Sequence, residues 1–176
     1  MKRFGLLLFT LSFLTGVSAQ NRIELASVGL SMDVTDSWAV TSDKSQESDG
    51  QEVGIGYVTR FDSRTADLCT IVRFETVDNG EPDGWAFYTP PVGYTEVSTD
   101  VDLPVDLPFE QAVVDVYRQV RGNGDDPNFV SRYYVVRAIR DDYRYRITIG
   151  GLDRQFDRKQ KEYQQMLASI RTKESL

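Results

Sequence analysis

The chain has 176 residues, and its 20 lysines and arginines against 27 aspartates and glutamates give a formal net charge of −7 at pH 7. An acidic chain repels the phosphate backbone of nucleic acids, so we expect no nucleic-acid partner. The sequence has no histidine and one cysteine, Cys69. An internal disulfide, a Cys–His nucleophile and a closed zinc site are therefore excluded.

Residues 1–19 have the three parts of a cleavable secretion signal. Lys2 and Arg3 follow the initial methionine, a mostly apolar run occupies residues 4–14, and Val17-Ser18-Ala19 forms a small-residue cleavage site. The run is shorter than the roughly 20 apolar residues of a spanning helix. No cysteine follows the cleavage site for lipid attachment. We expect a secreted or periplasmic protein without stable membrane insertion, in which residues 20–176 form one domain.

The N-terminal half of this domain is expected to be mostly strand. Residues 23–34 read as one strand, because apolar and polar residues alternate along it. Residues 42–52 are polar and without periodicity, which predicts a loop. Alternating or β-branched residues predict two further strands at 53–61 and 68–76, and place Cys69 as a small buried residue. Residues 100–108 contain two prolines, which predicts an extended segment outside the sheet ladder.

The C-terminal half gives clearer signals. Residues 111–121 and 128–140 are strand patterns, and the turn-forming residues 122–127 between them predict a hairpin. We interpret this segment (GNGDDP) as a turn and not as a unit of a calcium-binding repeat, because it occurs once. Another strand is expected at 143–149, ended by two glycines. Asp153 is then placed to cap a helix that runs to about Arg171.

The expected terminal helix is amphipathic and should cover one face of the sheet. Its apolar stripe consists of Phe156, Tyr163, Met166, Leu167 and Ile170. The residues expected to face water are Lys159, Lys161, Glu162 and Gln164.

The order of these segments is similar to that of a known family. A strand leads into a turn and Trp38 (VGLSMDVTDSWAV), the last strand reads YRYRITIG, and the helix ends at Leu167–Arg171 (LASIR). The pattern resembles the Mog1/PsbP-like family, including its exported bacterial PsbP-like members. The resemblance implies an α+β fold, an antiparallel sheet covered by helices in an α/β/α sandwich. It does not imply one function, since members include photosystem accessory proteins, a binder of a nuclear-transport factor and envelope proteins of unknown role. No functional residue carries over.

Two groups of residues are candidates for ligand or partner contact. The first is an aromatic stretch braced by two prolines: Trp85, Phe87, Tyr88 and Tyr94. Such rings form a contact surface for a protein or a small apolar ligand, or they cover the open face of the sheet. The second is a set of arginines on the C-terminal strands: Arg118, Arg137, Arg144 and Arg146. If these share a sheet face they can bind an anion; the alternative is cross-strand pairing with Asp115, Asp141 and Asp142.

The sequence contains no phosphate loop, nucleophile elbow or dinucleotide fingerprint. We therefore assign no catalytic residue, metal site or cofactor. The leading hypothesis is a non-enzymatic binding or accessory domain, with an envelope or extracellular protein or a small ligand as its partner. One alternative is a small carboxylate-based hydrolase or lyase, which requires a deep pocket with converging acids and arginines. Another is a structural or immunity-type protein that uses a flat sheet face.

Overall fold

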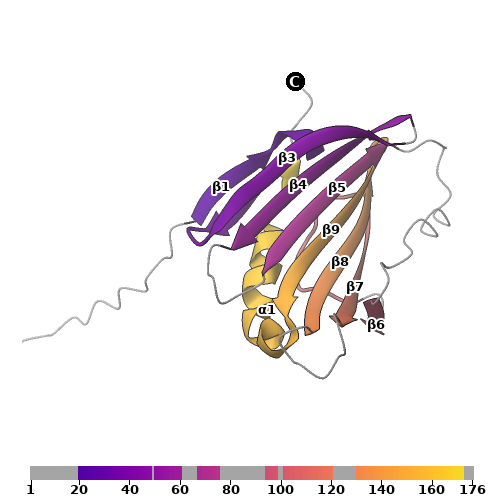
Figure 1. Cartoon of the computed structure of the whole chain (residues 1–176). Coiled ribbons are helices and arrows are strands. Elements are labelled where there is room, and N and C mark those ends of the chain that lie inside the picture. The colour runs from indigo at the N-terminus through magenta and orange to yellow at the C-terminus, as the bar shows by residue number, and fades with distance from the viewer. Residues whose placement is uncertain are drawn as a thin grey trace, which may run out of the picture.

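The computed structural model describes residues 20–48, 50–60, 67–75, 94–98, 101–120 and 130–172. The expected secretion signal lies outside these residues. The described chain forms two antiparallel sheets and one α-helix (Figure 1). This helix is not long and apolar enough to cross a membrane.

The larger sheet has seven strands in the order β3-β4-β5-β9-β8-β7-β6, and each is antiparallel to its neighbours. Its strands are β3 (Trp38–Ser48), β4 (Gln51–Arg60), β5 (Leu68–Glu75), β6 (Tyr94–Ser98), β7 (Gln111–Val120), β8 (Val130–Arg140) and β9 (Tyr143–Leu152). The predicted hairpin is confirmed as β7 and β8, and three other predicted strands correspond to β4, β5 and β9. The segment 101–110 has no regular secondary structure, as its prolines predict.

The smaller sheet corrects the prediction of one strand at residues 23–34. The chain forms β1 (Gln20–Leu25), a 3₁₀ turn (Ala26–Val28) and β2 (Leu30–Thr35), and β1 pairs with β2. Gly29 has a φ of 66°, which lets the chain reverse at little steric cost. A short strand after the helix, β10 (Arg171–Thr172), pairs with the other edge of β2.

The polar segment expected to be a loop at residues 42–52 is instead the end of the β3–β4 hairpin. Strand β3 is an edge strand, and its residues 43–47 are exposed. A strand with water on both faces has no buried side, so it shows no alternation of apolar and polar residues. The chain turns at Gly50, which has a φ of 78°.

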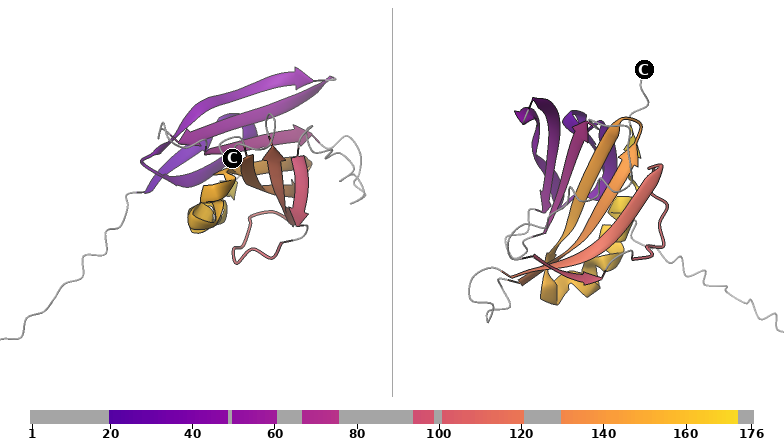
Figure 2. Two further views of the ribbon diagram at one scale, coloured as in Figure 1. Left: turned by 60° about the horizontal axis from the view of Figure 1, so that its bottom comes forward. Right: turned by 90° about the vertical axis from the view of Figure 1, so that its right-hand side faces the viewer.

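The helix α1 (Asp153–Ala168) lies against one face of the seven-stranded sheet, and the β1–β2 hairpin covers another part of that face (Figure 2). Apolar residues of the segment 101–110 also pack against the core on this side. The hairpin approaches closely at Gly54, where a Cβ would overlap the Ser27 carbonyl. Among the described residues, α1 is the one α-helix. The α+β class is therefore confirmed, whereas the expected α/β/α sandwich is matched only in part.

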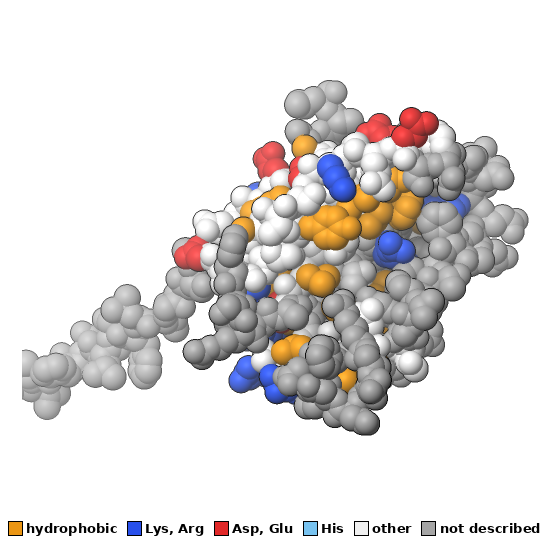
Figure 3. Space-filling model, in the orientation of Figure 1, with side chains coloured by type: hydrophobic (Ala, Val, Ile, Leu, Met, Phe, Trp, Pro, Cys, Tyr) orange, Lys and Arg blue, Asp and Glu red, His pale blue; other side chains and the backbone are white. Residues whose placement is uncertain are grey.

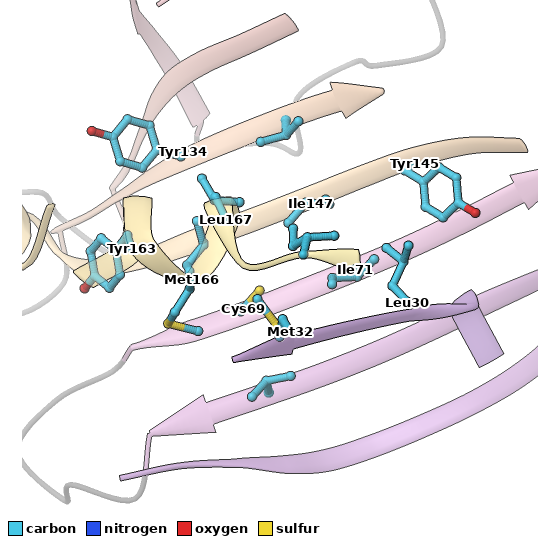
Figure 4. Packing of buried hydrophobic residues seen from close by; sticks show 14 of the residues in the cluster. Leu30, Met32, Cys69, Ile71, Tyr134, Tyr145, Ile147, Tyr163, Met166 and Leu167 are labelled. Atoms are coloured by element: carbon cyan, nitrogen blue, oxygen red, sulfur yellow. The ribbon is translucent and has the colours of Figure 1, made fainter. Parts of the chain in front are cut away.

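The main core lies between the sheet and the two elements that cover it, α1 and the β1–β2 hairpin. The helix contributes Met166 and Leu167, the hairpin Leu30 and Met32, and the sheet Cys69 and Ile71 (Figure 4). All five residues of the predicted apolar stripe are buried. Two details of the prediction are wrong. Strand β9 continues through Gly150 and Gly151 to Leu152, and residue 152, not Asp153, occupies the N-cap position.

Both glycines at the end of β9 are required by close neighbours. A Cβ on Gly150 would overlap the Arg132 carbonyl oxygen, and a Cβ on Gly151 would overlap the Asp67 carboxylate. Glycine here permits close packing and does not end the strand.

Candidate functional site

We call the face of the seven-stranded sheet that is opposite α1 the outer face. Alternate residues of a strand point to opposite faces. Because Val58, Ile71 and Ile147 belong to the core beneath α1, their sequence neighbours point to the outer face. The antiparallel register then aligns outer-face residues into rows that cross the sheet. One row runs Ile55, Val72, Arg146, Arg137.

One half of the outer face is apolar. Val53, Ile55 and Val72 form a buried cluster that is separate from the main core, and Phe74 packs against it. Tyr57 belongs to the next row and is 38 % exposed. Apolar side chains gather in the upper centre of this face, over β4 and β5 (Figure 3). The exposed ring of Tyr57 therefore lies beside a buried, well-packed apolar cluster.

The other half of the outer face carries three of the four candidate arginines together with a second buried apolar cluster, formed by Tyr117, Tyr133 and Val135. Arg137 of β8 is directly opposite Arg146 of β9. Arg144 lies two residues before Arg146 on the same strand and therefore points to the same face. Arg137 binds the buried carboxylate of Asp115 at 2.6 Å, which is one of the cross-strand pairs expected from the sequence. The Arg146 guanidinium lies 6.0 Å from the centre of the Phe74 ring, so Arg146 is adjacent to the apolar cluster on which Phe74 packs.

The fourth candidate, Arg118, lies on the opposite side of the sheet. Its Nε is 3.5 Å from an Asp153 carboxylate oxygen in the first turn of α1. The side chain of Arg118 therefore points to the helix side. The four arginines do not form one site, because Arg137, Arg144 and Arg146 lie on the outer face and Arg118 does not. Their assignment as anion-contact residues stays a prediction.

The aromatic candidates are largely outside the described residues. Trp85, Phe87 and Tyr88 lie outside them altogether. Tyr94 begins the edge strand β6, where it pairs with Gln119 of β7. Their assignment as contact residues stays a prediction.

A buried polar cluster joins α1 to the sheet, and the sequence prediction missed it. Lys159 was expected to face water, but it is 9 % exposed and its Nζ lies 2.5 Å from Asp67 Oδ2. The Nε of Arg60 is 3.3 Å from the same carboxylate oxygen. Burial and the neighbouring Asp67 carboxylate raise the pKa of Tyr163, so that its hydroxyl stays protonated.

Glu162 was also expected to face water and belongs to the same cluster. It accepts a hydrogen bond from Trp38 Nε1 at 3.0 Å and forms an ion pair with Arg60. One signal in the sequence pointed to the cluster. Lys159 follows Phe156 and precedes Tyr163 on the same helical stripe, and a lysine on a buried stripe requires a buried carboxylate.

None of the residues of this cluster lines either of two pockets in the described part of the chain. A pocket of about 470 Å³ lies between the segment 101–110 and β7, and its two carboxylates, Asp102 and Asp106, have no arginine or lysine beside them in the lining. A smaller pocket by β1 and β2 also lacks a basic residue. The converging acids and arginines that a carboxylate-based enzyme requires are thus absent from both.

Metal binding and thiol chemistry are two further possibilities for a functional site. No group of three or more histidine, cysteine, aspartate or glutamate side chains in the described residues is arranged to hold a metal ion. Cys69 is fully buried, as predicted, and burial raises the pKa of its thiol to about 12. A thiol of that pKa is protonated at neutral pH and is a poor nucleophile.

Comparisons with known proteins identify the fold. No family model and no curated protein matches the chain. Among solved structures, the solution structure of cyanobacterial PsbP (CyanoP) from Synechocystis sp. PCC 6803 is similar over 90 % of this chain and 95 % of that one, with a TM-score of 0.60 and 11 % identity. The chain has a PsbP-like fold. This confirms, for the fold, the Mog1/PsbP-like resemblance of the sequence.

The comparison also returned a second solved structure. The Ran-binding protein Mog1p of Saccharomyces cerevisiae matches 89 % of this chain and 96 % of that chain, with 13 % identity and a TM-score of 0.49. At such identities the PsbP-like fold identifies an architecture and assigns no residue of this chain to a function.

Proposed function

We propose that this protein is an exported, non-enzymatic binding or accessory domain that contacts an envelope or extracellular protein through its outer face. The observation that carries the proposal is Tyr57, an aromatic side chain 38 % exposed on the side of the sheet opposite α1. Tyrosine and arginine are enriched at the energetic centres of protein interfaces, and Tyr57 and Arg146 lie on this face.

The close packing of the apolar half of the outer face supports this proposal. Val53, Ile55 and Val72 are each less than 10 % exposed, so a partner that covers Tyr57 would press against ordered side chains. A preorganised surface costs less entropy on binding.

The experiment is site-specific photocrosslinking in the cells that produce the protein. A photoreactive amino acid is placed at Tyr57, and in a second strain at Gln165, which is exposed on α1. The proposal expects a defined crosslinked species from position 57 that position 165 does not give. Equal crosslinking from both positions, or none from position 57 while the protein is at its normal abundance, contradicts the proposal.

The same method tests the four aromatic candidates of the sequence analysis. Probes at Trp85, Phe87, Tyr88 and Tyr94 should crosslink to the same partner if the aromatic stretch contributes to the surface. Export is tested separately by sequencing the N-terminus of the protein recovered outside the cytoplasm. We expect Gln20 as the first residue, and recovery of chains that still begin at Met1 would contradict the proposed cleavage.

A further inference from the structure

The surface of α1 that points away from the sheet is basic, although the whole chain is acidic. Arg154, Arg158 and Lys161 are all exposed. Their spacing of four and three residues places them on one side of the helix, within about 60° of one another and along about 10 Å of its length. We call these three residues the basic stripe. Lysine and arginine side chains gather at the lower end of α1 (Figure 3).

The carboxylates nearest to the basic stripe already have partners. Arg132 of β8 binds Asp153 at 2.5 Å and Asp157 at 3.0 Å, and Arg118 adds a contact to Asp153 at 3.5 Å. The three stripe residues themselves make no ion pair within the described part of the chain. Together with Arg118 and Arg132, the basic stripe thus places five cations around Asp153 and Asp157. The next carboxylate on α1, Glu162, is bound by Arg60 and Trp38.

The composition of this surface favours a lipid headgroup over a protein partner. Protein interfaces need an apolar centre, and none of the large hydrophobic side chains exposed in the described chain lies on α1. An anionic membrane surface requires only positive charge, and each lysine or arginine near it contributes about 1 kcal/mol. At physiological ionic strength charges more than about 8 Å away are screened. The acidic residues elsewhere therefore do not cancel the attraction.

We propose that the basic stripe binds the phosphate headgroups of an anionic membrane surface, so that the domain associates peripherally through α1. The outer face lies on the opposite side of the sheet from α1, and in this orientation it points away from the membrane. The inference does not depend on the outer face having a partner, and either proposal can fail alone.

The test is sedimentation of the purified protein with vesicles of phosphatidylcholine, with and without phosphatidylglycerol. The wild type should bind only the vesicles that contain phosphatidylglycerol, and binding should decline as salt is added. Replacement of two charges, Arg154→Gln with Arg158→Gln, should weaken binding about 30-fold, which corresponds to the loss of two contacts of about 1 kcal/mol each.

A matched control removes the same number of charges elsewhere. Arg22→Gln with Lys44→Gln changes exposed cations of β1 and β3 and should leave vesicle binding unchanged. Circular dichroism checks that both variants fold. Failure of the wild type to bind anionic vesicles, equal binding to neutral ones, or equal losses in the two double variants would overturn the proposal. Failure of the wild type to bind anionic vesicles is also the result expected if the basic stripe binds an acidic protein and not a membrane.

Discussion

The buried ion pair between Lys159 and Asp67 makes a strong prediction about stability. The side chain of Asp67 is fully buried, and Lys159 is its nearest partner at 2.5 Å. Replacing Lys159 with methionine keeps most of the aliphatic stem but removes the charge. A buried carboxylate left without any partner costs about 3–5 kcal/mol. Because the Nε of Arg60 remains 3.3 Å away, we expect a loss at the lower end, about 3 kcal/mol.

The assay is equilibrium unfolding in urea, followed by circular dichroism. The matched control is Lys161→Met, two residues further along α1, where the side chain is exposed, and its effect should be within about 0.5 kcal/mol. Adding Asp67→Asn to Lys159→Met should recover part of the lost stability, because the remaining buried group is then neutral. If Lys159→Met and Lys161→Met have equal effects, Lys159 is not buried against Asp67 and the reasoning is wrong.

Three further predictions concern the core, the contact between the sheets, and the response to acid. Cys69 should not react with a thiol reagent at pH 8 in the folded protein and should react fully in denaturant, because burial raises its pKa to about 12 and excludes the reagent; labelling of the native protein at the rate of the unfolded chain would contradict this. Gly54→Ala should destabilise the protein by about 1–3 kcal/mol, because the new methyl group would overlap the Ser27 carbonyl; a thermal midpoint equal to that of the wild type would show that the β1–β2 hairpin is not packed there. The hydrogen bond from Arg22 lowers the pKa of Asp33, so the stabilisation is present above the unfolded pKa of about 3.9 and is lost as the pH falls through the lower native value. Asp33→Asn should therefore lower the free energy of unfolding at pH 7 and have no effect once the wild-type carboxylate is protonated. If urea unfolding shows the same difference between wild type and variant at both pH values, Arg22 does not stabilise the ionised form of Asp33.

The sequence predicted the elements whose burial pattern is local. The alternation at Leu30–Val34 appears in the structure as alternate buried and partly buried residues, and the apolar stripe of the terminal helix is buried. The β3–β4 hairpin was missed because its outer end has no buried face and thus no periodic signal. The reversal at Gly29 was missed because the apolar residues on both sides of it continue the same alternation.

The candidate sites depend on contacts between residues far apart in the chain. Asp67 and Lys159 are separated by 92 positions, so no local pattern could pair them. The alternation of Val53, Ile55 and Tyr57 correctly predicted a strand. It could not show that these residues face away from α1, because that depends on which side of β4 the helix packs. The four arginines were likewise predicted to lie on strands. In the folded sheet the side chain of Arg118 points to the helix side, whereas the other three point to the outer face.

The central claim is that the outer face is the surface that binds a partner. The most direct test measures the affinity of the partner crosslinked from position 57, once identified and purified, for the wild type and for Tyr57→Ala, with Gln165→Ala as the control. Truncation of an aromatic residue at the centre of an interface costs about 2 kcal/mol or more. We therefore predict at least about a 30-fold weaker Kd for Tyr57→Ala and an unchanged Kd for the control. An unchanged Kd for a folded Tyr57→Ala protein would contradict the claim.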